Sequence, residues 1–147
     1  MASSATLTPL SHHLLINGEL VLGSGAPETV LNPATGEILA HVHEASAEQV
    51  EAAIFAAHEA FSSWSRTTPQ QRSVCLLAIA DVIERNADSL ARLEALNCGK
   101  PLHLARQDDL SAAVDVFRFF AGAVRCQSGQ LSGEYIPGYT SMVRRDP

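Results

Sequence analysis

The sequence predicts an α/β protein in which a layer of helices is flanked by small β-hairpins. Apolar residues recur at helical spacing over four segments between residues 46 and 126. Short apolar runs around Asn-Gly and Pro-Gly turns precede and follow these helices. No series of strands is long enough to form a central parallel sheet. The helices therefore either form a bundle by themselves or cover a sheet encoded further along, and the strand-like segments at both ends favour the second interpretation.

The first part of the chain is predicted to contain a leader and short β elements. Residues 1–13 are rich in Ser and Thr, which predicts a leader segment without regular secondary structure. In Leu14–Leu22, two apolar runs flank Asn17-Gly18, which predicts a hairpin because a type I′ turn needs positive φ at both central residues. Two loops and one short strand are then expected, at Gly23–Glu28, Asn32–Glu37 and Ile38–Val42.

Two of the helices are predicted to begin with a capping box. Ser46 precedes Gln49 by three residues, and Thr68 precedes Gln71 by the same spacing. In this motif the hydroxyl accepts the N–H of the third helical residue, and the glutamine side chain reaches back to the cap. Pro69 occupies the first helical position, where its missing N–H costs nothing.

The other two helices and the buried faces follow from apolar spacing. A third helix is predicted over Ala87–Leu96, ending at Gly99, and a fourth over about Leu104–Cys126. The fourth is so apolar over Val116–Val124 that burial on most sides is expected. A strand, a Pro-Gly turn and another strand are predicted over Gly133–Arg144. The residues expected to be buried are Val50, Ile54, Ala57, Phe61, Val74, Leu77, Ala80, Ile83, Leu90, Leu93, Leu96, Ala113, Phe117, Phe119, Phe120 and Val124.

Composition narrows the class of protein. The formal net charge of −6 argues against a nucleic-acid partner. No apolar run approaches the roughly 18 residues of a membrane helix, and the first residues lack the positive charge of a secretory signal. We therefore expect a cytoplasmic protein that does not bind membranes. Three widely spaced cysteines predict neither a disulfide framework nor a zinc site but reduced, idle thiols.

The residues alone define no self-contained active site. No glycine-rich phosphate loop and no Gly-x-Ser-x-Gly motif is present. Cys75 and Cys98 lack a neighbouring histidine base. His41 and His43 share one face of a strand, as a metal site would require, but no further ligand of suitable spacing completes a site, and the same holds for the His12-His13 pair. Asp108-Asp109 is interpreted as complementing the positive end of a helix dipole.

Several segments together resemble the start of the aldehyde dehydrogenase superfamily, from about Leu14 to Pro147. The order and spacing of five motifs carry this resemblance: Ile16-Asn17-Gly18-Glu19, Asn32-Pro33-Ala34-Thr35-Gly36-Glu37, Gly99-Lys100-Pro101, Phe119-Phe120-Ala121-Gly122 and Arg144-Arg145-Asp146-Pro147. Longer stretches, Asn97–His103, Val114–Gly122 and Thr140–Pro147, are similar to bacterial gamma-aminobutyraldehyde dehydrogenases. Those enzymes oxidise 4-aminobutanal to 4-aminobutanoate in putrescine degradation; betaine aldehyde and other aminoaldehyde dehydrogenases are the competing assignments.

The resemblance implies a chemistry whose reacting groups this chain does not contain. In the family a cysteine thiolate attacks the aldehyde, hydride passes to NAD and a glutamate-activated water releases the acid. All these groups, and the NAD site, lie beyond the position matching Pro147. We therefore expect no catalytic residue in the chain, no NAD bound by it alone, and no activity from the isolated 147 residues.

Two sites are carried over from the family by position. Asp109 and Ala112 match a helix that lines the substrate tunnel, where an acid would attract the distal ammonium of an aminoaldehyde. Val30 and Leu31, through their carbonyls, and Asn97 match a monovalent cation site. Many family members have Asp at the last position, and an amide oxygen ligates a hard cation without the charge.

The resemblance also implies an organisation and partners. Residues 14–127 would be the amino-terminal part of the NAD-binding domain, and residues 128–147 the start of a β arm that joins subunits into homo-oligomers. The alternative from another class is a non-catalytic interaction module, a truncated homologue that pairs through the arm or acts as a scaffold.

Overall fold

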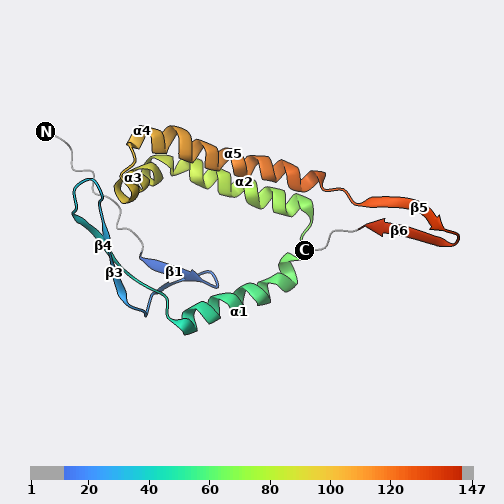
Figure 1. Cartoon of the computed structure of the whole chain (residues 1–147), viewed down its shortest axis with the longest axis horizontal. Coiled ribbons are helices and arrows are strands. Elements are labelled where there is room, and N and C mark those ends of the chain that lie inside the picture. The colour runs from blue at the N-terminus through green and yellow to red at the C-terminus, as the bar shows by residue number, and fades with distance from the viewer. Residues whose placement is uncertain (1–11, 144–147) are drawn as a thin grey trace. The chain divides into compact units, whose positions relative to one another are not determined.

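The computed structural model describes residues 12–143 of the chain, apart from the side chains of Leu131, Ser132 and Tyr135. Most of the predicted leader and the motif Arg144–Pro147 lie outside the described residues. Figure 1 shows the elements in chain order: β1 (His13–Ile16), β2 (Glu19–Leu22), β3 (Pro27–Leu31), β4 (Ile38–His43), α1 (Ala47–Trp64), α2 (Pro69–Arg85), α3 (Ala87–Cys98), α4 (Leu102–Leu104), the π-helical segment η1 (Ala105–Asp109), α5 (Leu110–Ala123), the 3₁₀ segment η2 (Val124–Cys126), β5 (Gln130–Ile136) and β6 (Tyr139–Val143). None of the described helices is both long and apolar enough to cross a bilayer.

The chain forms two compact units, which we describe separately. One comprises Met1–Phe61 with Arg92–Leu102, and the other Ser62–Ala91 with His103–Pro147. The described strands form three antiparallel pairs, β1–β2, β3–β4 and β5–β6. The predicted fold class is confirmed: the described residues carry helices and small hairpins, and no parallel sheet.

The hairpins form where turn residues supply positive φ. Ile16 pairs with Glu19 in the β1–β2 hairpin, and Asn17 and Gly18 have φ of 52° and 80°. Pro137-Gly138 joins β5 and β6, with Gly138 at φ 84°. Asn17-Gly18 thus has the two positive φ values of a type I′ turn, whereas Pro137-Gly138 has positive φ only at its second residue, as in a type II turn; both turn predictions are confirmed.

The strand β3 was not predicted, because Pro27 and Glu28 were assigned to a loop. Pro27 opens the strand, a position where a missing N–H is tolerated. The register passes from Val30–Ala40 to Leu31–Ile38, so Leu39 is the extra residue of a β-bulge.

A network of hydrogen bonds centred on Gln49 ties the loop after β2 to the start of α1. The backbone N–H of Gln49 donates to Ser46 Oγ at 3.3 Å, and its Oε1 accepts from Ser46 N at 3.1 Å, which confirms the predicted capping box. The same Oε1 accepts from Ser24 N at 2.9 Å. Gln49 Nε2 donates to the Leu22 carbonyl at 2.7 Å. One side chain therefore caps a helix and closes a loop 25 residues away.

The second capping box is also confirmed. Thr68 Oγ1 accepts from Gln71 N, and Gln71 Oε1 accepts from Thr68 N at 2.8 Å. The corner before α2 is closed by Arg72, whose Nε donates to Thr67 Oγ1 at 2.8 Å and whose guanidinium lies 5.5 Å from the ring centroid of Trp64. A cation over an indole ring is attracted by the quadrupole of the ring, so Arg72 contacts both the end of α1 and the loop that leads into α2.

The buried core of the second unit consists almost entirely of small side chains. α2 packs against α5, and the two helices lie side by side in Figure 1. Small residues let two helix backbones approach closely. The described apolar residues that are buried are Ala80, Ala87, Ala91, Ala105, Val114 and Ala121.

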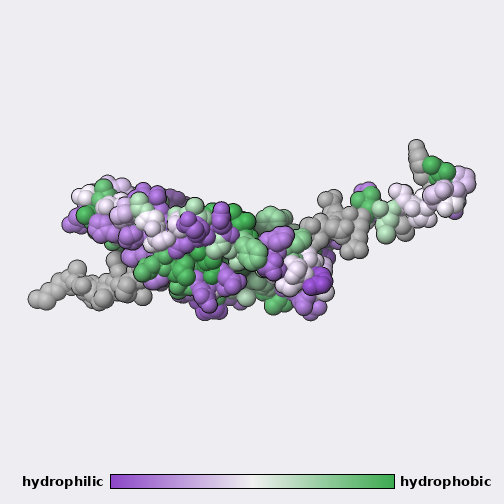
Figure 2. Space-filling view, turned by 90° about the horizontal axis from the view of Figure 1, so that it is seen from below, coloured by the Kyte–Doolittle hydropathy of each residue, from purple (hydrophilic) through white to green (hydrophobic). Residues whose placement is uncertain are grey.

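The larger apolar residues predicted to be buried are mostly exposed, and this part of the prediction is wrong for the chain by itself. Val74 on α2 is 61% exposed, and Phe119 on α5 is 66% exposed. The residues that the two helices bury are few and mostly small: Ser73 and Ala80 on α2, and Val114 and Ala121 on α5. Figure 2 shows hydrophobic residues, in green, at the surface among hydrophilic ones. A self-contained bundle does not leave such faces uncovered, which favours the interpretation of a covering layer.

Candidate functional site

The helix that carries Asp109 and Ala112 is continuous from residue 102 to 126, but one of its turns is a π-helix. α4, η1, α5 and η2 follow one another without a break. The Leu110 N–H donates to the Ala105 carbonyl, five residues back. Asp109 ends this wide turn and is half-buried, and Ala112 lies one turn further on and is exposed. The helix prediction is confirmed, and its boundary lies two residues earlier than expected.

The dipole interpretation of Asp108-Asp109 is wrong. Both residues lie inside the helical run rather than at its start, since the run begins at Leu102. The backbone of Asp109 has φ −70° and ψ −50°, and its side chain makes no capping hydrogen bond. A helix dipole acts within about the first turn, so it does not account for an acid at this position.

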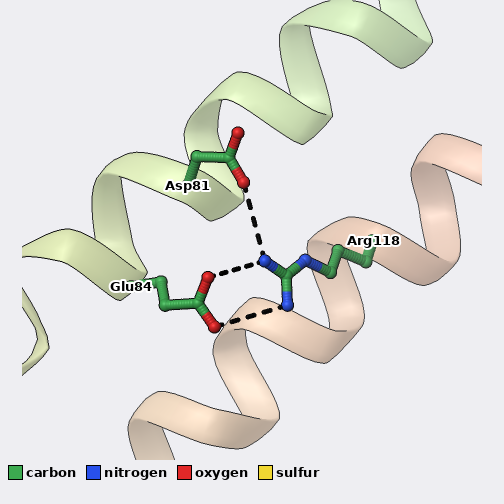
Figure 3. Close-up of polar contacts among 3 residues, drawn as sticks. All are labelled: Asp81, Glu84 and Arg118. Atoms are coloured by element: carbon green, nitrogen blue, oxygen red, sulfur yellow. Dashed lines mark hydrogen bonds and ion pairs between the residues drawn. The ribbon is translucent and has the colours of Figure 1, made fainter.

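Two sets of ion pairs hold this helix against its neighbours in the second unit. Arg106, within the π turn, donates from Nε to Asp88 Oδ1 at 2.7 Å. Arg118 on α5 donates to Glu84 at 2.7 Å and lies 3.5 Å from Asp81, both on α2 (Figure 3). The hydrogen bond that Arg118 donates to Glu84 and the negative charge of Glu84 raise the pKa of Arg118.

A shallow depression of about 250 Å³ lies between these two ion pairs. Its polar lining includes Ser111 and Asp115 of α5. Both arginines that border it already have carboxylate partners. The depression is therefore better described as a solvated groove between helices than as a ligand site.

The positions proposed to hold a cation belong to one unit, and the structure brings their surroundings together. Val30 and Leu31 end β3, and the turn that follows is closed by Asn32, whose Oδ1 accepts from Ala34 N at 2.9 Å. Gly99, at the end of α3, faces this turn: a Cβ on Gly99 would lie 2.9 Å from Pro33 Cγ.

Asn97 lies in the last turn of α3, two residues before this contact. Its side-chain Nδ2 donates weakly to Cys98 Sγ at 3.8 Å. Gly99 has φ 71° and donates to the Ala95 carbonyl at 3.0 Å, which confirms the predicted helix stop. The loop after β3 and the end of α3 are therefore neighbours, as the cation hypothesis requires.

The histidines of β4 have other partners. His41 Nδ1 lies 3.2 Å from Thr29 Oγ1, and His43 Nδ1 lies 3.3 Å from the Gly25 carbonyl oxygen. Among the described residues, no three His, Cys, Asp or Glu side chains are close enough to share a metal ion.

The three cysteines, Cys75, Cys98 and Cys126, are free and exposed. The hydrogen bond with Glu94 raises the pKa of the Cys98 thiol. Since the thiolate is the nucleophilic form, this shift works against a catalytic role for Cys98.

Four of the described glycines do not lead into a helix. Gly18 and Gly36 lie in turns between paired strands, and Gly23 and Gly25 lie in the loop between β2 and β3. A phosphate-binding loop needs glycines that lead directly into a helix amino terminus. The resemblance singled out Asp109 as a candidate, but the sequence predicted neither the π turn nor the ion pairs around it, because neither has a recognisable motif.

Comparison with known proteins identifies the family. The model of the aldehyde dehydrogenase family matches residues 22–147, and the chain belongs to this family. Over 113 residues, the chain is 45% identical to aldehyde dehydrogenase 1 of Tanacetum cinerariifolium. The aligned stretch covers 75% of the chain and 23% of the relative. The family predicted from the motifs is thereby confirmed.

Solved structures agree with this assignment. A betaine aldehyde dehydrogenase from Staphylococcus aureus, solved with NAD+, superposes with a TM-score of 0.85 at 35% identity, over 92% of this chain and 28% of that one. An aldehyde dehydrogenase from Bacillus cereus superposes with a TM-score of 0.84 at 38% identity, over 90% of this chain and 27% of that one. The chain thus spans about a quarter of the length of the relatives it matches.

Proposed function

We propose that this chain is the amino-terminal part of an NAD-dependent aldehyde dehydrogenase that oxidises 4-aminobutanal to 4-aminobutanoate in putrescine degradation. The observation that carries the proposal is Asp109, a half-buried carboxylate at one end of an exposed apolar stripe. Ala112 and Val116 continue this stripe at spacings of three and four, which place them on one helix face. Val116 is 51% exposed. An apolar wall that ends in an acid suits a short aldehyde with a distal ammonium.

The competing substrate is betaine aldehyde, after the solved relative. Both aldehydes carry a positive charge, so a carboxylate attracts either one. The ammonium of 4-aminobutanal also donates hydrogen bonds, whereas a quaternary ammonium does not. We propose the aminoaldehyde because a carboxylate binds a cation more tightly when that cation also donates hydrogen bonds to it. A higher kcat/KM for betaine aldehyde than for 4-aminobutanal in the whole enzyme would reverse this choice.

The whole enzyme would have the organisation of its family. We propose that residues 14–127 belong to the NAD-binding domain and that residues 128–147 begin the β arm that joins subunits into a homo-oligomer in the cytoplasm. β5 and β6 form only a two-stranded pair, which leaves strand edges that another subunit could extend. No nucleic-acid or membrane partner is proposed.

The isolated 147 residues are expected to produce no NADH from 4-aminobutanal and NAD+. The described residues pair no thiol with a histidine base and provide no phosphate-binding loop, so no step of the oxidation has its groups in place. Absorbance at the NADH band, with the whole enzyme as a positive control, measures this directly. NADH formation by the isolated chain above the rate without protein would contradict the proposal. Inactivity of the whole enzyme toward every aldehyde would favour the non-catalytic interaction module.

We also propose a monovalent cation site formed by the carbonyls of Val30 and Leu31 with the side chain of Asn97. Its support is the contact between Gly99 and Pro33, which places the end of α3 against the turn after β3. The Asn97→Asp variant is expected to bind K+ about tenfold more tightly, because a carboxylate adds charge to an oxygen ligand set. K+ titration of the whole enzyme's melting temperature measures the affinity, with Asn17→Asp as a control in an unrelated turn. Equal K+ affinity in the Asn97→Asp variant and the parent would exclude the site.

A further inference from the structure

The π turn Ala105–Asp109 resolves a conflict of helical phase. Ala105 is completely buried and Val114 is 7% exposed, so both ends of this stretch face packed surfaces. They are nine residues apart, and an α-helix turns by about 100° per residue. A regular helix would therefore place the two side chains about 180° apart, on opposite faces.

One extra residue in the turn removes this conflict. The bond from Leu110 N–H to the Ala105 carbonyl closes a turn of five residues where an α-helix has four. The rotation between the two side chains is then the same as for eight residues of a regular α-helix, which is about 80°. Both can be buried in the same unit, and the backbone of the wide turn bulges between them.

Asp109 is the last residue of the bulge, and the helix is held on both sides of it. Arg106 pairs with Asp88 before it, and Arg118 pairs with Glu84 after it. If the turn loses one residue and becomes an α-turn, Ala105 and Val114 keep the same relative orientation, whereas the backbone that carries the Asp109 carboxylate no longer bulges.

We propose that the π turn is a positioning device that places the Asp109 carboxylate against the distal ammonium of the substrate, with Arg106 as its positioning residue. This inference rests on the proposed function, since it assumes that Asp109 meets a cationic aldehyde. π turns occur frequently at functional sites, and here the turn has a defined geometric effect. Deletion of one residue converts it into an α-turn and leaves the flanking helix faces in phase.

The test is deletion of Gln107, an exposed residue of the turn, in the whole enzyme. The deletion is expected to raise KM for 4-aminobutanal about tenfold, because a carboxylate that moves from about 4 to about 6 Å from the ammonium loses that much attraction. KM and kcat for pentanal, the uncharged aldehyde of the same length, are expected to stay within about twofold. The Gln107→Ala variant keeps the length of the turn and is the matched control. Unchanged KM for both aldehydes in a folded deletion variant would overturn the inference.

A milder variant covers the case in which the deletion does not fold. Arg106→Ala frees the turn from Asp88 and is expected to raise KM for 4-aminobutanal about threefold, as loss of one exposed ion pair allows. Arg106→Lys restores most of the affinity, and Arg118→Ala, which removes an ion pair outside the turn, leaves the ratio of the two KM values unchanged. An equal effect of Arg106→Ala and Arg118→Ala on that ratio would refute the positioning role. Asp109→Asn separates the two claims. If this variant leaves KM for 4-aminobutanal unchanged, the proposed function is refuted. If it raises KM but the turn variants do not, only the positioning role of the π turn is refuted.

Discussion

Gly23→Ala is expected to destabilise the chain by about 3 kcal/mol, the upper end of the usual cost of overpacking. A Cβ at this buried position would lie 2.2 Å from the His43 carbonyl oxygen and 2.5 Å from that of Glu44. Both are backbone atoms, so no side chain can turn aside to make room. The loop could move only by breaking the hydrogen bonds from Gln49 to Leu22 and from Gly25 to Glu44. Urea unfolding of the isolated chain, followed by circular dichroism, measures the change.

The matched control is a glycine with open space around it. Gly122 lies within α5, and a Cβ there would meet nothing within 4 Å. Gly122→Ala is expected to stabilise the helix by up to about 1 kcal/mol, because alanine loses less backbone freedom than glycine. Equal unfolding midpoints for Gly23→Ala and the parent would show that the loop does not pack against the end of β4 as described.

Local features of this chain were predictable because they depend on residues a few positions apart. Asn17-Gly18 and Pro137-Gly138 specify hairpin turns through φ alone, and both capping boxes need only a hydroxyl and a glutamine three residues later. The start of β3 was missed because the pairing that makes Pro27 a strand residue comes from β4, 16 residues away.

Burial was predicted poorly because an apolar stripe does not show which neighbour covers it. Val74 and Phe119 were expected inside and are exposed, whereas Ala80, also expected inside, is buried, as is Ala121 on the helix that packs against α2. Helices that cover a sheet have one apolar face toward the sheet and another toward the neighbouring helix. The sequence pattern therefore predicts two buried faces, whereas only the face toward the neighbouring helix is buried in this chain. Asp109 was proposed as a site residue only through resemblance to the family, since no local pattern distinguishes it from Asp108.

Asp109→Asn in the whole enzyme is expected to raise KM for 4-aminobutanal about thirtyfold and to leave kcat nearly unchanged. Two opposite charges about 4 Å apart attract by about 4 kcal/mol at an effective dielectric constant of 20. About half of this is expected to be lost to desolvation of the carboxylate and the ammonium, which leaves about 2 kcal/mol, or about thirtyfold in affinity. Asparagine keeps the shape and an acceptor oxygen, so the variant isolates the charge. The distal ammonium is not at the reacting carbon, so its loss weakens binding of substrate and transition state equally and appears in KM.

Pentanal is the internal control for this variant, because a methyl group replaces the ammonium on the same chain length. Its KM is expected to stay the same or to fall, since the amide presents less charge to an apolar chain end. A second control is Asp108→Asn, which removes the same charge from the adjacent, exposed position. Residues next to each other on a helix point about 100° apart, so only one of the two can face the substrate. If Asp109→Asn and Asp108→Asn raise KM equally, the general negative field of the helix attracts the aldehyde, and not a contact with Asp109. If only Asp109→Asn raises KM, the contact is assigned to the Asp109 carboxylate.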